Sequence, residues 1–318
     1  MKGDRALVPD ADFRSYYGRA ILKPPVWKQP DVPLYLFLGG VAGASSVLAE
    51  GAAAADLPAL RRVARLSAAT GAGLGTVALI HDLGRPERFL NMLRVFKPTS
   101  PLSVGSWILS PFATFASAAA ASEVTGIAPR LGRLAGVGAA VFGPPLTTYT
   151  AALLCNTAVP SWHEAHREMP FLFAGSGSAA AGGLAMTLVP LDQAGPARRL
   201  AAVGAALELG VSELMEHNLG SLLSEPYKTG KSGRLLRAAK MMTVAGGLGA
   251  AVSGRSRVLS GLAGLALMGG SILTRFGVYE AGMVSARDPK YTVIPQRERV
   301  DARAAAAQTA APEVSVAG

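Results

Sequence analysis

Charged residues are scarce in this sequence. Asp, Glu, Lys and Arg make up 16% of its 318 residues, whereas soluble domains carry about 25%. Small residues are abundant, with 58 Ala and 37 Gly, and the mean hydropathy is +0.32. This composition is typical of helices that pack closely within lipid. It excludes an ordinary soluble enzyme, a disulfide-stabilised scaffold and a disordered chain.

Cysteine and histidine are also rare. Cys155 is the only cysteine, so the chain forms no internal disulfide and is expected to hold no iron–sulfur cluster, which generally needs four thiolates. The four histidines include no two that are well placed on facing spans, so we expect neither a bis-histidine haem nor a metal. His163, Glu164, His166 and Glu168 resemble a metal cluster, but the sequence favours a short solvated connector there.

Eight charge-poor windows mark the expected membrane spans, because about 20 apolar residues cross the roughly 30 Å hydrocarbon core as a helix. The windows are 32–49, 66–80, 98–122, 134–162, 169–191, 200–215, 241–254 and 258–274. The sixth is weak because Glu208 and Glu213 interrupt it. We therefore predict an all-α integral membrane protein with eight transmembrane helices.

The distribution of Lys and Arg predicts the orientation of these helices. An even number of spans puts both chain ends on one side, and the segments on that side carry 21 Lys and Arg against 9 on the other. The positive-inside rule then places both termini in the cytoplasm, with the spans in the cell (inner) membrane. This topology explains the net charge of +10, so the charge does not indicate binding of nucleic acid. The long connections lie on the same side, where we expect a protein partner to dock.

Four parts of the chain follow from these spans. They are the cytoplasmic N-terminal tail at 1–31, helices one to four at 32–162 with a partner-facing loop at 82–103, helices five to eight at 163–280, and a C-terminal tail at 281–318 that is expected to be disordered from residue 300.

The connection after the second window concentrates titratable groups. Residues 81–89 read His-Asp-Leu-Gly-Arg-Pro-Glu-Arg-Phe. Asp82 with Arg85 or Arg88 would form a partly buried, charge-assisted pair. The alternative is an interfacial loop whose charges are simply solvated. Asp82 and His81, at the inner end of the second helix, are the first candidates for proton exchange.

Five stretches of the chain resemble one family of membrane proteins. They read SYYGRAILKPPVWK (15–28), VPLYLFLGGVAGASSVLA (32–49), HDLGRPERFLNMLRVFKPTSPLSVGSW (81–107), YTAALLCNTAVPSW (149–162) and RFGVYEAGMVSARDPKYTVIPQR (275–297). Together they resemble the polysulfide-reductase membrane-anchor family, also called NrfD-like, over almost the whole chain. The resemblance implies two four-helix bundles, without haem, that exchange electrons between the quinone pool and a ferredoxin-like iron–sulfur subunit. That subunit would in turn serve a molybdopterin catalytic subunit, whose substrate this chain does not reveal.

A quinone, whether menaquinone or ubiquinone, needs an apolar slot for its ring and donors for its two carbonyl oxygens. Gly39, Gly40 and Gly43 of the first window leave room for a flat ring against the helix backbone. Close packing of helices through small residues is the alternative explanation for all three.

Tyr149 is the predicted quinone-binding donor. A phenol buried in lipid needs a hydrogen-bond partner, and the resemblance matches Tyr149 to the quinone-binding tyrosine of the family. Arg85 and Arg88 complete the predicted cofactor-binding residues. At His81 the sequence departs from the family, in which an apolar residue is expected before the aspartate.

Ionisable residues within spans are costly and are functional candidates by default. Glu208 is expected near mid-membrane, as a third candidate for proton exchange. Glu213, Glu216 and His217 follow on the same half of that helix, where they would either line a water-accessible path or reach solvent at the helix end.

Four further charged residues lie at span ends. We expect Arg275 and Glu280 to pair with each other or to lie at the interface, and Glu50 and Glu123 to be solvated. Small residues and intramembrane carboxylates would also suit a secondary transporter or channel. A purely structural anchor that binds no quinone is the third possibility.

Overall fold

Helices form the whole of the described architecture. The computed structural model describes residues 21–84 and 87–310, the side chains of residues 88, 90 and 304–310 excepted. Over these residues the chain forms helices and no strand: α1 (Asp31–Ala54), α2 (Pro58–Leu83), α3 (Glu87–Met92), α4 (Pro101–Thr125), α5 (Pro129–Cys155), α6 (Pro160–His163), α7 (Met169–Leu188), α8 (Gly195–Asn218), α9 (Gly220–Lys228), α10 (Gly230–Val252), a 3₁₀ turn (Ser253–Arg255), α11 (Arg257–Arg287) and α12 (Lys290–Ala310).

Seven of the described helices are long and apolar enough to cross a membrane, namely α1, α2, α4, α5, α7, α10 and α11. Helix α8 has 24 residues, which is also long enough, but it carries more charge. Large apolar side chains point outward from these helices: Val141 is 65% exposed, Leu248 67% and Leu265 57%. An apolar surface of this kind is matched to lipid rather than to water. The chain is therefore an integral membrane protein.

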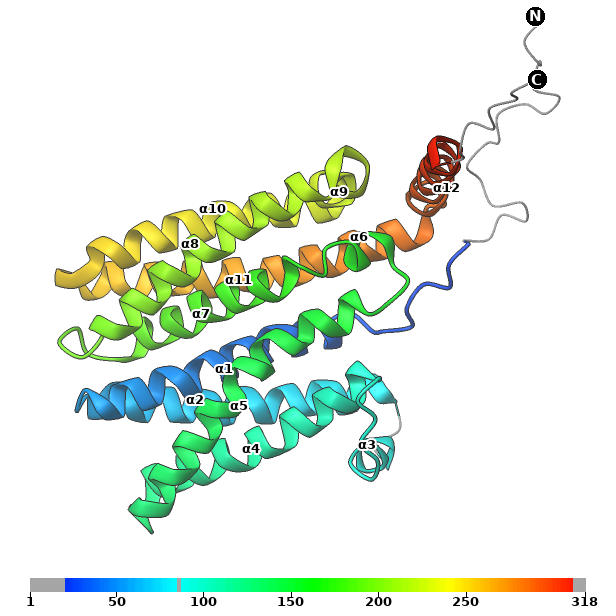
Figure 1. The fold of residues 1–318 in the computed structure, drawn as a ribbon. Helices are drawn as coiled ribbons and strands as arrows, with labels where there is room; N and C mark the ends of the chain where they lie inside the picture. The colour runs from blue at the N-terminus through cyan, green and yellow to red at the C-terminus, as the bar shows by residue number, and fades with distance from the viewer. Residues whose placement is uncertain (1–20, 85–86, 311–318) are drawn as a thin grey trace, which may run out of the picture.

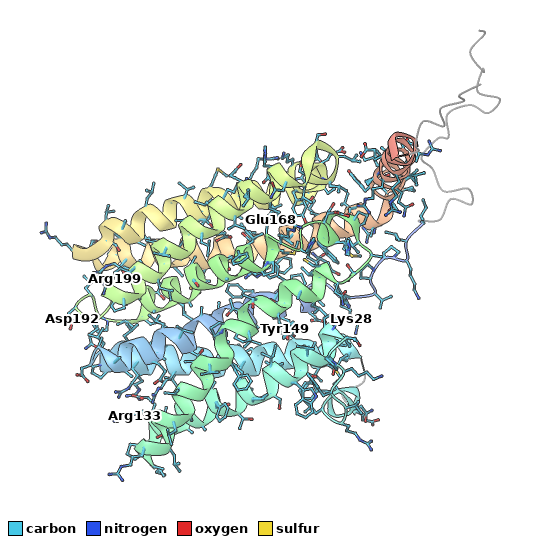
Figure 2. The ribbon with its side chains drawn as sticks, viewed as in Figure 1. Lys28, Arg133, Tyr149, Glu168, Asp192 and Arg199 are labelled. Atoms are coloured by element: carbon cyan, nitrogen blue, oxygen red, sulfur yellow. The ribbon has the colours of Figure 1, made fainter. Side chains whose placement is uncertain are left out.

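The two ends of the molecule differ in complexity (Figure 1). Residues 21–30 and helices α3, α6, α9 and α12 all lie at one end, which we call the loop-rich end. The opposite end holds only the short connections 55–57, 126–128, 189–194 and 253–256, and we call it the plain end. Figure 2 shows Tyr149 within the molecule, between Lys28 at the loop-rich end and Arg133 at the plain end.

The long helices pack in two groups. Helix α1 packs on α2 and α5, and α4 packs on the same two helices, so these four make the first group. Helices α7, α8, α10 and α11 make the second group. The groups meet where α1 contacts α7 and α11, and where α5 contacts α7. Helix α1 is thus the element through which the two groups are most directly joined.

Small residues allow the helices to approach closely. A Cβ atom at Gly177 in α7 would lie 3.0 Å from the backbone of Gly40 in α1. A Cβ atom at Gly183 would lie 2.7 Å from the carbonyl oxygen of Gly264 in α11. Lipid supplies no hydrophobic driving force between helices, so such close backbone packing is a main source of their association.

Some segment ends differ from the sequence expectation. Helix α2 begins at Pro58, before the predicted window, so Arg61 and Arg65 lie within the helix. Its first turns can carry these charges because they lie at the plain end rather than in lipid. Helix α11 continues to Arg287. The expected disorder from residue 300 is wrong as far as Ala310, because α12 continues to that residue. The rest of that tail lies outside the described residues.

Candidate functional site

The segment before α1 is fastened to the end of α2 at the loop-rich end. The carboxylate of Asp82 accepts a hydrogen bond of 2.7 Å from the backbone N–H of Lys28. The Lys28 ammonium donates to the carbonyl oxygen of His81 at 3.2 Å. The His81 ring contacts the Asp31 carboxylate, with Nδ1 and Oδ2 separated by 2.7 Å. Gly84 ends α2 with a φ of +68°, a left-handed conformation that favours glycine.

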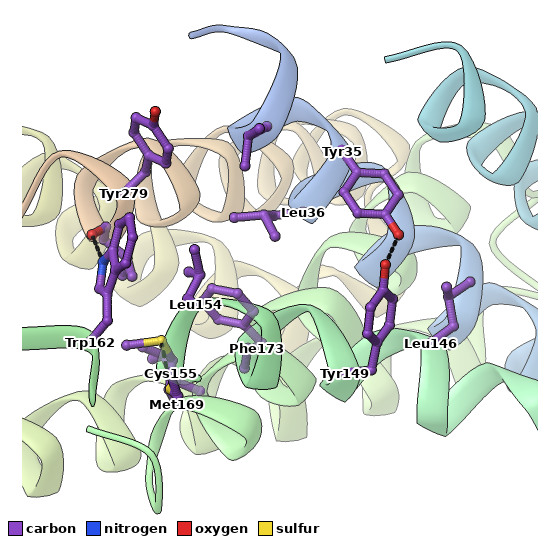
Figure 3. Packing of buried hydrophobic residues seen from close by; sticks show 14 of the residues in the cluster. Tyr35, Leu36, Leu146, Tyr149, Leu154, Cys155, Trp162, Met169, Phe173 and Tyr279 are labelled. Carbon is purple, nitrogen blue, oxygen red and sulfur yellow. Dashed lines mark hydrogen bonds between the residues drawn. The ribbon is translucent and has the colours of Figure 1, made fainter. Parts of the chain in front are cut away.

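A pair of buried tyrosines lies one helical turn deeper. Tyr35 follows Asp31 by four residues in α1, which places both on one face of the helix. The Tyr35 hydroxyl forms a short hydrogen bond with the Tyr149 hydroxyl of α5 (Figure 3). Both side chains are buried, at 2% and 8% exposure. A hydroxyl has one proton to donate and two lone pairs, so the pair as a whole keeps one O–H for a further acceptor.

Helix α4 approaches the ring of Tyr149 through a glycine. A Cβ atom at Gly105 would overlap the ring and would lie 2.7 Å from the hydroxyl oxygen. On the other side, a Cβ atom at Gly75 of α2 would lie 3.6 Å from the ring of Tyr35. Glycines on α2 and α4 therefore leave the space in which the two phenols meet.

A second buried polar group lies among the helices of the second group. The Glu208 side chain of α8 is 4% exposed. It accepts hydrogen bonds from the hydroxyls of Thr274, at 2.6 Å, and Thr243, at 3.5 Å. Gly175 of α7 permits the approach, because a Cβ atom there would lie 2.7 Å from the backbone nitrogen of Glu208.

Arg275 follows Thr274 in α11 and is fully buried. Its Nη2 donates to the carbonyl oxygen of Phe173 at 2.9 Å, and its Nε donates to the carbonyl oxygen of Leu36 at 3.3 Å. Its guanidinium carbon also lies 3.8 Å from the centre of the Phe173 ring, a cation–π arrangement. Its Nη1 has no hydrogen-bond partner among the described residues.

The sequence model of the family described as polysulphide reductase, NrfD, matches residues 22–195, more than half of the chain. The chain belongs to the NrfD family. Members of this family are membrane subunits of oxidoreductase complexes, and they assemble with other oxidoreductase subunits. A comparison with curated proteins found no match. The resemblance inferred from the five stretches is thereby confirmed.

The structure distributes the predicted site residues of this NrfD-family chain over two levels. His81 and Asp82 lie together at the loop-rich end, and Tyr149 lies deeper in the first group. Arg85 lies outside the described residues, and so does the side chain of Arg88. The expected Asp82–arginine pair is therefore not described, and the described partner of Asp82 is the backbone N–H of Lys28.

The three glycines of α1 face other helices. A Cβ atom at Gly43 would collide with the Gly143 carbonyl and the Thr147 hydroxyl of α5. One at Gly40 would lie 3.2 Å from Nη2 of Arg275, and one at Gly39 would lie 3.8 Å from the methyl carbon of Thr150. These contacts favour close helix packing at Gly40 and Gly43, the alternative stated above.

Sequence reasoning missed Tyr35 and Asp31. The signal was available, because a tyrosine in a charge-free span needs a polar partner, and Tyr149 is another such residue. Asp31 and Tyr35 are four residues apart in α1, so they lie on one face of the helix. This spacing connects the tyrosine pair to the titratable residues at the loop-rich end.

At the plain end of the NrfD-family chain, the expectation that Glu50 and Glu123 are solvated is wrong. Arg65 contacts Glu50 at 2.7 Å and Glu123 at 3.2 Å, and Arg61 contacts Glu123 at 3.0 Å. The side chains of Arg65 and Glu123 are 8% and 10% exposed. Arg61 and Arg65 lie one turn apart in α2, so both reach Glu123 of α4, and Arg65 also reaches Glu50 of α1.

The other charged candidates have local partners. Lys240 of α10 contacts Glu213 at 2.7 Å and Glu216 at 2.8 Å. Glu280 lies 3.7 Å from Lys231, so the first of the two alternatives expected for Arg275 and Glu280, a pair with each other, is wrong. Among the described residues no group of three or more His, Cys, Asp and Glu side chains could hold a metal ion.

Proposed function

We propose that this NrfD-family chain is the quinone-reactive membrane anchor of a multisubunit oxidoreductase. Its two groups of long helices would be two transmembrane four-helix bundles, with α8 as the eighth span. The observation that carries the proposal is the pair of buried hydroxyls of Tyr35 and Tyr149, one turn of α1 below the contact between Asp31 and His81. A quinone site needs a donor in apolar surroundings close to groups that exchange protons with water, and this arrangement offers both.

The chemistry of these residues would suit the head of a quinone. Leu146 and Phe112 are fully buried neighbours in the same apolar cluster as the two tyrosines, so the surroundings of the hydroxyls are apolar. The hydroxyl pair keeps one O–H that would donate to a quinone carbonyl oxygen. When bound, the quinone would supply two-electron, two-proton redox chemistry.

Proton exchange would take place at the loop-rich end of α1 and α2. His81 has a side chain that is 73% exposed, whereas that of Asp31 is 14% exposed. The imidazole would therefore exchange protons with water, and the carboxylate of Asp31 would lead toward Tyr35. Asp82 would hold the segment before α1 in place and would exchange protons next to His81. Arg85 and Arg88 remain proposed binding residues of the same connection.

The loop-rich end would dock the partner subunits. A ferredoxin-like iron–sulfur subunit would lie there, close to the tyrosine pair, and a molybdopterin catalytic subunit would bind to it in turn. The excess of Lys and Arg supports a cytoplasmic loop-rich end in the inner membrane. A C-terminal tag accessible only from the cytoplasmic side would agree with this topology, and periplasmic accessibility would reverse it.

Isolation of the native complex in mild detergent tests the function. We expect the chain to co-purify with an iron–sulfur subunit and with extractable quinone. Solute flux by the chain alone in vesicles would support a secondary transporter instead. A partner subunit without any quinone would support a purely structural anchor.

A further inference from the structure

Glu208 lies on one wall of a small cavity. The cavity has a volume of about 20 Å³ and lies among α7, α8, α9, α10 and α11. Its lining includes Glu208, Ser212, Glu216, Lys240 and Tyr227. A space of about 10–15 Å³ holds one water molecule when polar groups line it. The cavity therefore has room for a water molecule between Glu208 and the charged residues at the loop-rich end.

The far wall of the cavity includes polar side chains that reach the surface. Glu216 is 14% exposed and Lys240 is 31% exposed, and the two side chains are joined at 2.8 Å. Lys240 also contacts Glu213, which is 71% exposed. Glu208, Ser212 and Glu216 follow one another at intervals of four residues, so they lie along one face of α8. This face provides a polar route from solvent to the buried carboxyl.

Neutralisation by an ion pair does not account for Glu208. The described hydrogen bonds of Arg275 go to the carbonyls of Leu36 and Phe173, and those of Glu208 come from two threonine hydroxyls. Arg275 acts on Glu208 as a nearby positive charge. The charged groups that face Glu208 from the surrounding helices are therefore Arg275 on α11, and Lys240 and Glu216 across the cavity. Ser176, Thr243 and Thr274 supply hydroxyls.

Arg275 connects this carboxyl to the first group of helices. Its Nε donates to the carbonyl oxygen of Leu36, the residue after Tyr35 in α1. Its Nη1 is buried and has no partner among the described residues, so the guanidinium has a donor free to turn toward a change of charge nearby. A gain or loss of charge at Glu208 would change the pull of Arg275 on α1, next to the tyrosine pair.

We propose that Glu208 is a proton-binding site loaded from the loop-rich end through this cavity, and that its occupancy is coupled through Arg275 and Leu36 to the Tyr35–Tyr149 pair. One proton passes from water to a carboxylate oxygen of Glu208 and returns by the same route. Only the O–H bond forms and breaks, and no electron moves. The coupling part of the proposal rests on the proposed quinone function, whereas the loading part does not.

Infrared difference spectroscopy of the purified complex, titrated with acid and base, tests the loading. We expect a carbonyl-stretch band of a protonated carboxylic acid that is lost in Glu208→Gln. The matched control is Glu213→Gln, which removes an exposed carboxyl from the same helix and should leave the band unchanged. Ser212→Leu narrows the route and should slow hydrogen–deuterium exchange at the band. A band that persists in Glu208→Gln, or that never titrates, overturns the proposal.

Labelling of the wild-type complex gives a second test that needs no variant to fold. Dicyclohexylcarbodiimide reacts with protonated carboxyl groups in apolar surroundings. Mass spectrometry should find the adduct on Glu208, with a yield that falls as the pH is raised. Absence of the adduct at every pH contradicts the loading.

Decylubiquinone serves as the probe for the coupling. Its binding should shift the Glu208 band. Binding that leaves the band in place overturns the coupling alone. A complex that titrates at Glu208 but does not bind decylubiquinone overturns the quinone function and leaves the loading intact.

Discussion

The hydroxyls of Tyr35 and Tyr149 meet at the contact between α1 and α5, although 114 residues separate them in the chain. Tyr35 also follows Asp31 by one helical turn, so α1 carries both the carboxylate that contacts the exposed His81 ring and the phenol that meets Tyr149. This relationship links the loop-rich end to the interior of the first group of helices.

Removal of either hydroxyl of the pair should slow quinol-coupled turnover. Tyr149→Phe and Tyr35→Phe each lose one hydrogen bond to the quinone or to the partner phenol, which is worth about 1 kcal/mol, so a loss of about fivefold or more is expected. Turnover of the native complex with decylubiquinol measures it. Tyr291→Phe is the matched control, because it removes the hydroxyl of a buried tyrosine of α12, outside both groups of helices. Equal turnover in all three variants would remove the tyrosine pair from the site.

Substitutions at Asp82 separate a structural role from a role in proton exchange. Asn keeps an oxygen that accepts from the backbone N–H of Lys28, whereas Ala removes it. We expect Asp82→Asn to insert normally and to lose quinol-coupled turnover, and Asp82→Ala also to loosen the segment before α1, measured by limited proteolysis. Full turnover in the Asn variant would assign Asp82 a structural role only.

Two glycines of α1 should respond differently to an added methyl group. Gly43→Ala collides with α5, whereas at Gly39 the nearest atom is at an ordinary contact distance of 3.8 Å. Overpacking in a close-packed interior costs about 1–3 kcal/mol, so Gly43→Ala should lower the thermal unfolding temperature and Gly39→Ala should not. Scanning fluorimetry in detergent measures both. If Gly39→Ala keeps the fold but loses quinone binding, the ring lies against that glycine.

The sequence predicted the helices better than their polar partners. Long charge-free windows predict spanning helices because lipid requires every backbone group to be paired within its own helix. The partners of Tyr149 and Arg275 come from helices distant in the chain, and a periodicity does not specify which faces meet. Glu208 was recognised from its position within a span, since a buried carboxyl stands out in apolar sequence. For Arg275 the sequence suggested either a pair with the nearby Glu280 or a position at the interface, whereas packing turned it toward Leu36 of α1.

The ionic network at the plain end should be sensitive to loss of its central cation. Arg65→Met leaves Glu50 and Glu123 without their shared partner, and breaking a buried pair costs about 3 kcal/mol at the low end. The low end applies because a cavity of about 670 Å³ beside the network admits water. Chemical denaturation in detergent measures the change. Arg62→Gln alters an exposed neighbour and should be neutral. If Arg65→Met unfolds at the same denaturant concentration as the wild type, the charges of the network are solvated.

Attachment of α12 to α9 should weaken at acidic pH. Lys290 donates to Glu225 at 2.8 Å, and this hydrogen bond lowers the pKa of the Glu225 carboxyl. A carboxyl whose pKa is lowered on folding contributes stability above its unfolded pKa of about 4.3, and the contribution is lost as the pH falls through the folded value. Proteolysis at α12 should therefore rise below about pH 4. At neutral pH, Glu225→Gln should be cleaved at α12 as fast as the wild type is at acidic pH. A variant that is cleaved as slowly as the wild type at neutral pH would contradict the contact.

Photo-crosslinking of a quinone to the native complex tests the central claim most directly. An azidoquinone is bound to the complex, illuminated, and its adducts are mapped by mass spectrometry, with decylubiquinone as the competitor. The proposed function predicts adducts on α1 and α5 around Tyr35 and Tyr149, which decylubiquinone removes and Tyr149→Phe reduces. Adducts confined to other helices, or adducts that the competitor leaves unchanged, would contradict it.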